Sequence, residues 1–67
     1  MNKKKSYYCV ARGKKRGIFD NFEDCYELTN GCGHNLFKSF KYFEDAQDFL
    51  FEKTGIWIEK DEINKKI

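Results

Sequence analysis

The stretch "YYCVARGKKRGIF", residues 7–19, joins two strand-like segments through a basic turn. Residues 6–12 alternate and are rich in aromatic and β-branched side chains, which is typical of a β-strand. Gly13 and Gly17 flank three consecutive basic residues, and glycine tolerates the positive φ angles that tight turns require. The segment "GIFD" then returns as a second strand. The sequence therefore predicts an antiparallel hairpin with a cationic turn.

A helix is predicted near residues 22–30, directly after this hairpin. Asn21 is a favourable N-cap residue, and Asp24 three positions later strengthens the capping signal. Spacings of three and four define one face of this helix, made of Cys25, Leu28 and Thr29. The segment "NGCG" ends the helix, because asparagine and glycine tolerate left-handed backbone geometry.

The second half of the chain predicts one more strand and one more helix. The segment "NLFKSF", residues 35–40, is interpreted as the third strand. A helix near residues 43–54 follows, and Gly55 marks its end. Apolar residues that align on one face of this helix are Phe43, Ala46, Phe49 and Leu50.

This order of elements, β-β-α-β-α, predicts a small α+β fold. We expect a three-stranded antiparallel sheet with two helices packed on one face. The predicted boundaries are a basic N-terminal tail at 1–5, a folded domain at 6–54, and a C-terminal tail or linker at 55–67. For the segment "IWIEKDEINKKI" the sequence leaves a short strand, a further helix and a linker open.

Length and cysteine content limit the possible functions. A chain of 67 residues buries only about 60% of its unfolded surface, which leaves little room for a deep active-site cleft. No apolar run of membrane-spanning length and no secretory signal is present, so we expect a cytoplasmic protein without membrane contact. Three cysteines without a signal peptide indicate reduced thiols.

A zinc-stabilised fold is an alternative that the cysteines raise. Cys9, Cys25, Cys32 and His34 would supply four ligands. The only close pair is Cys32-Gly33-His34, which is tighter than typical zinc knuckles. We therefore expect core thiols and neither a metal nor another cofactor.

Charge is distributed unevenly along the chain. Residues 1–16 hold seven of the thirteen basic residues and none of the eleven acidic ones, although the net charge is only +2. A cationic end of this kind attracts phosphate backbones through counterion release. In contrast, no nucleophile lies at an interpretable spacing from the single histidine, and no phosphate-binding glycine loop opens a helix. The sequence favours a binding module and not an enzyme.

The ordered motifs resemble a known family. Its pattern here consists of Tyr7-Tyr8 and Val10, the basic Gly13–Gly17 turn, Phe22 with Cys25, Phe37-Lys38 with Phe40, and Asp45-Ala46 with Phe49. Over roughly residues 5–52 the chain resembles the small N-terminal domain of eukaryotic-type ribonuclease H, also found in caulimovirus viroplasmin. The resemblance implies a non-catalytic module that binds RNA/DNA hybrid, and more weakly double-stranded RNA. It also implies a ribonuclease H catalytic domain in the same longer chain as a partner.

The resemblance further implies a set of binding residues. Phe22 and Phe37 would face deoxyribose sugars, and Tyr8, Lys38 and Ser39 would surround a DNA phosphate. Backbone amides around Gly31 to His34 would meet RNA 2′-hydroxyls. Nearby cations that would add phosphate contacts are Lys14, Lys15, Arg16 and Lys41.

Two departures from the family pattern predict weaker binding than in a typical member. Phe22 replaces the usual tryptophan, and Ser39 stands where a second basic residue is common. An alternative function is a protein-interaction module of the viroplasmin type. In that case Phe22, Phe37 and Trp57 would form an exposed aromatic patch for a protein partner.

Overall fold

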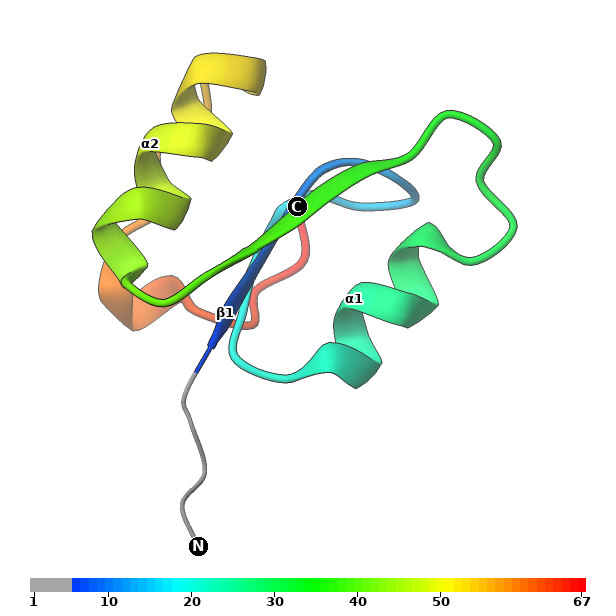
Figure 1. Ribbon diagram of the computed structural model, residues 1–67. Helices are drawn as coiled ribbons and strands as arrows, with labels where there is room; N and C mark the ends of the chain where they lie inside the picture. The colour runs from blue at the N-terminus through cyan, green and yellow to red at the C-terminus, as the bar shows by residue number, and fades with distance from the viewer. Residues whose placement is uncertain (1–5) are drawn as a thin grey trace, which may run out of the picture.

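Three strands form an antiparallel sheet with the order β2-β1-β3 in the computed structural model of the chain, which describes residues 6–67 (Figure 1). The strands are β1 (Tyr7–Arg12), β2 (Gly17–Phe19) and β3 (Leu36–Phe40). The central strand, β1, therefore pairs with both others, and the predicted hairpin and third strand are confirmed. The predicted basic tail at 1–5 lies outside the described residues.

The two predicted helices are confirmed as α1 (Phe22–Thr29) and α2 (Phe43–Thr54). The Asn21 side chain accepts a hydrogen bond from the Asp24 backbone N–H at 2.9 Å, so the predicted cap begins α1. Gly55 ends α2 in the left-handed conformation with φ of 80°. The chain thus has the predicted small α+β fold with the order β-β-α-β-α.

The helices lie on opposite faces of the sheet, so the prediction that both pack on one face is wrong (Figure 1). Cys9 and Ala11 of β1 pack in the cluster that contains the buried residues of α2. Val10, between them in sequence, packs with Cys25 and Leu28 of α1. Because successive side chains of a strand point to opposite faces, an apolar central strand needs a cover on both sides.

The pairing of β1 with β3 shifts register near the end of β1. Val10 pairs with Phe37, whereas Arg12 pairs with Leu36, the residue immediately before Phe37. Such a bulge inserts an extra residue into one strand and redirects the side chains that follow. Ala11 and Arg12 therefore both lie on the α2 side, where Leu36 also packs.

The segment 55–67, left open by the sequence, packs against the sheet and α2. Ile58 is fully buried, and the buried Gln47 side chain donates to its carbonyl oxygen at 2.8 Å. A short 3-10 helix at Lys60–Glu62 follows. Arg16 and Ile67 then exchange two backbone hydrogen bonds of 2.8 and 2.9 Å. This segment therefore covers the outer edge of the hairpin and is part of the folded unit.

Candidate nucleic-acid interface

Four aromatic side chains gather on the α1 side of the sheet. We call this group the aromatic face; its members are Tyr8, Phe22, Tyr26 and Phe37. The ring centroids of Tyr8 and Phe22 lie 5.7 Å apart in an edge-to-face arrangement, and those of Phe22 and Tyr26 lie 6.0 Å apart. Phe22, Tyr26 and Phe37 are 52%, 55% and 41% exposed. A small domain that exposes three large rings on one side carries a surface suited to a flat, partly apolar ligand.

The exposure of Phe37 follows from the short length of α1. This helix has eight residues, and its buried side chains cover Val10 of β1 and Phe19 of β2. Phe37 is the cross-strand partner of Val10 and so emerges on the same face, but it lies outside the buried cluster under α1. The α1 side of β3 is therefore left open. Phe37 was expected to look outward, and the structure places it there.

The polar residues predicted beside these rings divide between the two faces. Ser39 is the cross-strand partner of Tyr8 and lies on the aromatic face. Lys38 is the partner of Cys9, so its side chain leaves on the α2 side, with Nζ 5.6 Å from the centroid of the Phe40 ring. Lys38 belongs to an edge strand. Its long side chain therefore starts at the rim of the sheet and not in the aromatic face.

Lys41 follows the end of β3 and is exposed. Its Nζ lies 5.7 Å from the centroid of the Tyr42 ring. Because β3 ends at Phe40, alternation does not extend to Lys41.

The loop after α1 presents main-chain donors to solvent. Gly31 adopts φ of 84°, and Asn35 closes the loop by donating to the carbonyl oxygens of Thr29 and Cys32 at 3.1 and 2.9 Å. Gly31 and His34 are exposed. Within residues 6–67, the backbone N–H groups of Gly31 and His34 donate to no protein acceptor. The loop thus offers unpaired amides of the kind that bind hydroxyl oxygens.

The basic turn is held in place from two sides. The Lys14 backbone N–H donates to the Leu28 carbonyl oxygen at 2.9 Å, which ties the turn to α1. On the other side, Arg16 pairs with Ile67 as described above. The side chains of Lys14, Lys15 and Arg16 are exposed. Arg16 lines a hollow on the α2 side, so the structure does not bring it into the aromatic face.

Tyr26 is the member of the aromatic face that the sequence analysis missed. It lies four residues after Phe22 on the same short helix, and residues at this spacing share a helix face. Its signal was therefore present in the sequence. The predicted face of this helix was instead the buried one, which Cys25, Leu28 and Thr29 form.

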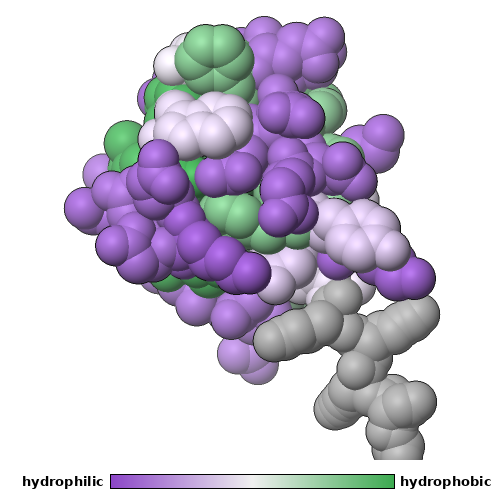
Figure 2. Space-filling model, turned by 90° about the vertical axis from the view of Figure 1, so that its left-hand side faces the viewer, coloured by the Kyte–Doolittle hydropathy of each residue, from purple (hydrophilic) through white to green (hydrophobic). Residues whose placement is uncertain are grey.

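Trp57 lies apart from this face. It pairs with Phe51 of α2, with ring centroids 6.0 Å apart, and its Nε1–H donates to Glu59 at 3.1 Å. Viewed from the α2 side, the surface is mainly hydrophilic, with apolar and near-neutral side chains gathered near the top (Figure 2). Phe22, Phe37 and Trp57 thus do not form the single patch that the protein-interaction alternative requires.

Two of the three free cysteines, Cys9 and Cys25, are buried in the core. Burial, and to a smaller degree the nearby Cys25, raises the pKa of Cys9 to about 12, and burial also raises the pKa of Cys25. Both thiols therefore stay protonated at neutral pH, and the thiolate is the reactive form. In the part of the chain that the structure describes, no three His, Cys, Asp or Glu side chains form a group that could hold a metal ion. None of the helices there is long and apolar enough to cross a membrane.

Comparison with known proteins identifies relatives of this arrangement. The profile of the family described as "Ribonuclease H1 N-terminal domain" matches residues 6–50. The chain is 39% identical over 46 residues to a ribonuclease H of Schizosaccharomyces pombe and 30% identical over 50 residues to one of Saccharomyces cerevisiae. A ribonuclease H of Crithidia fasciculata is 36% identical over 47 residues.

These matches cover 69%, 75% and 70% of this chain, respectively. They cover only 17%, 14% and 10% of the three relatives. The chain thus corresponds to a small part of each relative. No solved structure gives a significant match.

Proposed function

The chain belongs to the family of ribonuclease H1 N-terminal domains, and we propose that it is a non-catalytic module that binds RNA/DNA hybrid. In this proposal it holds the duplex for a ribonuclease H catalytic domain in the same longer chain. Tethering would raise the local concentration of substrate at that domain. The observation that carries the proposal is the exposed aromatic face beside a loop of unpaired amides.

The two parts of this surface favour different sugars. The Phe22 and Phe37 rings pack on deoxyribose, whereas a ribose would push its 2′-hydroxyl into an apolar ring. A hydroxyl left without a partner costs about 1–3 kcal/mol. The loop amides at Gly31 and His34 instead gain partners from RNA 2′-hydroxyls and lose them on DNA. Hybrid is the duplex that satisfies both parts across a wide, shallow minor groove.

Phosphate contacts add affinity without sequence preference. Tyr8 and Ser39 are cross-strand neighbours that would bind one DNA phosphate together. Lys38 and Lys41 would reach the backbone from the rim of the sheet, and Lys14 and Lys15 from the turn beside α1. If about four phosphates are neutralised, the logarithm of the affinity falls with the logarithm of salt concentration with a slope of about −3 to −4.

The test compares Phe37→Ala with Phe51→Ala, a matched variant at an exposed phenylalanine on the α2 side. Matched hybrid, RNA duplex and DNA duplex are titrated at two salt concentrations. Fully burying a phenylalanine is worth about 1.5–3 kcal/mol, so burying the 41% of Phe37 that is exposed contributes about 1 kcal/mol. Phe37→Ala should therefore reduce the preference for hybrid over RNA duplex about fivefold, while Phe51→Ala preserves it.

Two results would contradict the proposal. If the wild-type domain binds no duplex at moderate salt, the nucleic-acid function is wrong. If Phe37→Ala binds but keeps the wild-type preference among duplexes, the sugar-packing role of the ring is wrong.

A further inference from the structure

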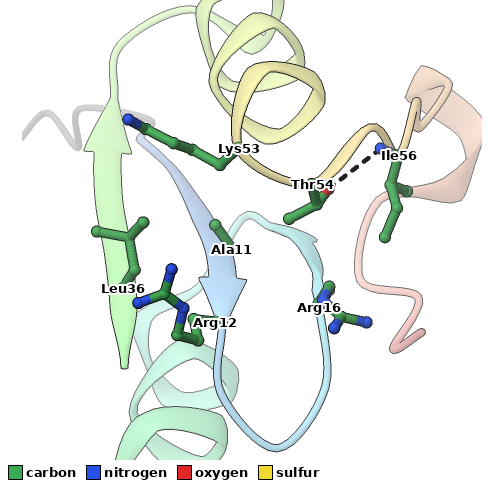
Figure 3. Close-up of a pocket in the computed structure, with 7 residues that line it drawn as sticks. All are labelled: Ala11, Arg12, Arg16, Leu36, Lys53, Thr54 and Ile56. Atoms are coloured by element: carbon green, nitrogen blue, oxygen red, sulfur yellow. Dashed lines mark hydrogen bonds between the residues drawn. The ribbon is translucent and has the colours of Figure 1, made fainter. Parts of the chain in front are cut away.

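A cationic hollow lies on the α2 side of the sheet, on the face opposite the aromatic face. Its volume is about 390 Å³, within the range of about 300–1,000 Å³ that is common for small-molecule sites. Arg12 comes from the end of β1, Arg16 from the turn, and Lys53 from the last turn of α2. Figure 3 shows Arg12 beside Ala11 and Leu36, with the charged ends of Lys53 and Arg16 on opposite sides of them. The remaining lining residues are Leu36, Thr54 and Ile56.

The bulge in β1 directs the Arg12 side chain into this hollow. With regular alternation, Arg12 would follow Val10 onto the α1 side. The register shift instead pairs Arg12 with Leu36 and places both beside Ala11 on the α2 side. Bulges often redirect side chains next to functional sites. The fold thus brings an arginine into a hollow that already holds Arg16 and Lys53.

Within residues 6–67, no ion pair neutralises the three cations that line this hollow. Among residues 6–67, ion pairs join Lys65 with Glu62 and Lys66 with Asp24, and neither pair involves a cation of the hollow. No lining residue is acidic. Lys53 has only a weak ring contact, with Nζ 5.8 Å from the centroid of Phe49.

We propose that this hollow binds the phosphate group of a nucleotide. Arg12, Arg16 and Lys53 line the hollow without an ion pair among residues 6–67, and the guanidinium fork of arginine matches the oxygens of a phosphate with paired hydrogen bonds. The apolar side chains of Leu36 and Ile56 provide a surface for the sugar or base beside the phosphate. The nucleotide is either free or part of a strand, since both carry this group. The site does not depend on the aromatic face, because β1 separates the two.

The experiment records two-dimensional amide spectra of the domain during titration, with ionic strength held constant by sodium chloride. The probes are AMP, inorganic phosphate, and a short DNA strand without terminal phosphates. We expect saturable shifts at Ala11, Arg12 and the amides of residues 54–56. Saturation by AMP and phosphate alone identifies a free or terminal phosphate as the ligand. Saturation by the DNA strand identifies a phosphodiester.

Variants test which side chains hold the phosphate. Loss of a charge-assisted hydrogen bond should weaken binding about tenfold or more, so we expect this effect from Lys53→Gln and from Arg12→Gln. Arg12→Lys keeps the charge but loses the fork, and should also weaken binding. Lys60→Gln removes an exposed cation outside the hollow and should leave binding unchanged. Lys53 is on an exposed helix surface, so its substitution keeps the fold intact even if changes at Arg12 do not.

Several results would overturn the proposal. One is the absence of saturable shifts at the hollow with all three probes. Another is an equal loss of affinity in Lys60→Gln, which would indicate only general electrostatic attraction. A third is binding of a short poly-glutamate peptide at these amides when no phosphate probe binds there. Phe37→Ala should leave all of these shifts unchanged, so failure here is distinct from failure of hybrid binding.

Discussion

Substitution of Gly13 by alanine should destabilise the domain, because the added methyl group has no room. A Cβ atom at Gly13 would lie 2.7 Å from the Leu28 carbonyl oxygen and 3.2 Å from Cγ1 of Val10. The first contact is with backbone, so either the turn or the end of α1 must move. That movement also strains the 2.9 Å hydrogen bond from the Lys14 N–H to the same oxygen.

The magnitude follows from these two contacts. Overpacking costs about 1–3 kcal/mol, and loss of one backbone hydrogen bond costs about 1 kcal/mol. Gly13→Ala should therefore lower the free energy of unfolding by about 2–4 kcal/mol. In a domain of this size each kcal/mol shifts Tm by about 4–8 °C, which predicts a decrease of about 8–32 °C.

Gly33→Ala is the matched control, measured by thermal and urea unfolding under the same conditions. A Cβ at Gly33 meets nothing within 4 Å, so alanine there should stabilise the domain slightly, by about 0.4–1 kcal/mol, through the unfolded state. Even 1 kcal/mol should shift Tm by about 4 °C or more. A Tm for Gly13→Ala within about 2 °C of the wild-type value would therefore refute the steric argument. The attachment of the basic turn to α1 would then need another explanation.

Two further predictions concern the rings and the buried thiols. Phe22→Trp should tighten hybrid binding several-fold, because tryptophan adds apolar area and an N–H donor at a side chain that is already half exposed. Titration with the hybrid duplex measures this change. An unchanged affinity would indicate that the duplex does not contact α1. Stability should fall as pH rises above about 9, because the unfolded chain then ionises Cys9 while the folded chain, with a pKa of about 12, keeps the thiol protonated. The slope is at most about 1.4 kcal/mol per pH unit for this group, and urea unfolding at pH 8 to 10 should show a flatter profile in Cys9→Ala.

Local sequence signals predicted the elements of this fold well. The Asn21 cap and the Gly55 stop each act within a few residues, and the helices and strands begin and end close to the predicted positions. These features depend on backbone geometry that neighbouring residues determine.

The arrangement of the two helices needed information that was present but not used. Cys9, Val10 and Ala11 are three consecutive apolar residues in β1, and all three are buried. A strand that alternates for one covered face would show a polar residue among them, so this run indicates cover on both faces. In contrast, the direction of Arg12 depends on a register shift between strands that are distant in sequence. No local sequence pattern predicts that register shift.

The aromatic face also bears on the two departures from the family pattern. The resemblance implies a tryptophan at the start of α1, which would offer more area than Phe22, so the phenylalanine alone would predict a smaller contact surface. Tyr26 lies against Phe22 on the same helix, however, and is 55% exposed. Together with Tyr8 these rings form a continuous surface that no single residue provides. Tyr26 therefore partly offsets the smaller area of Phe22. Within residues 6–67, no basic residue beside Ser39 replaces the missing cation on this face, because Lys38 points to the α2 side. For the hybrid-binding function that we propose, this predicts a smaller loss of sugar discrimination than of phosphate affinity.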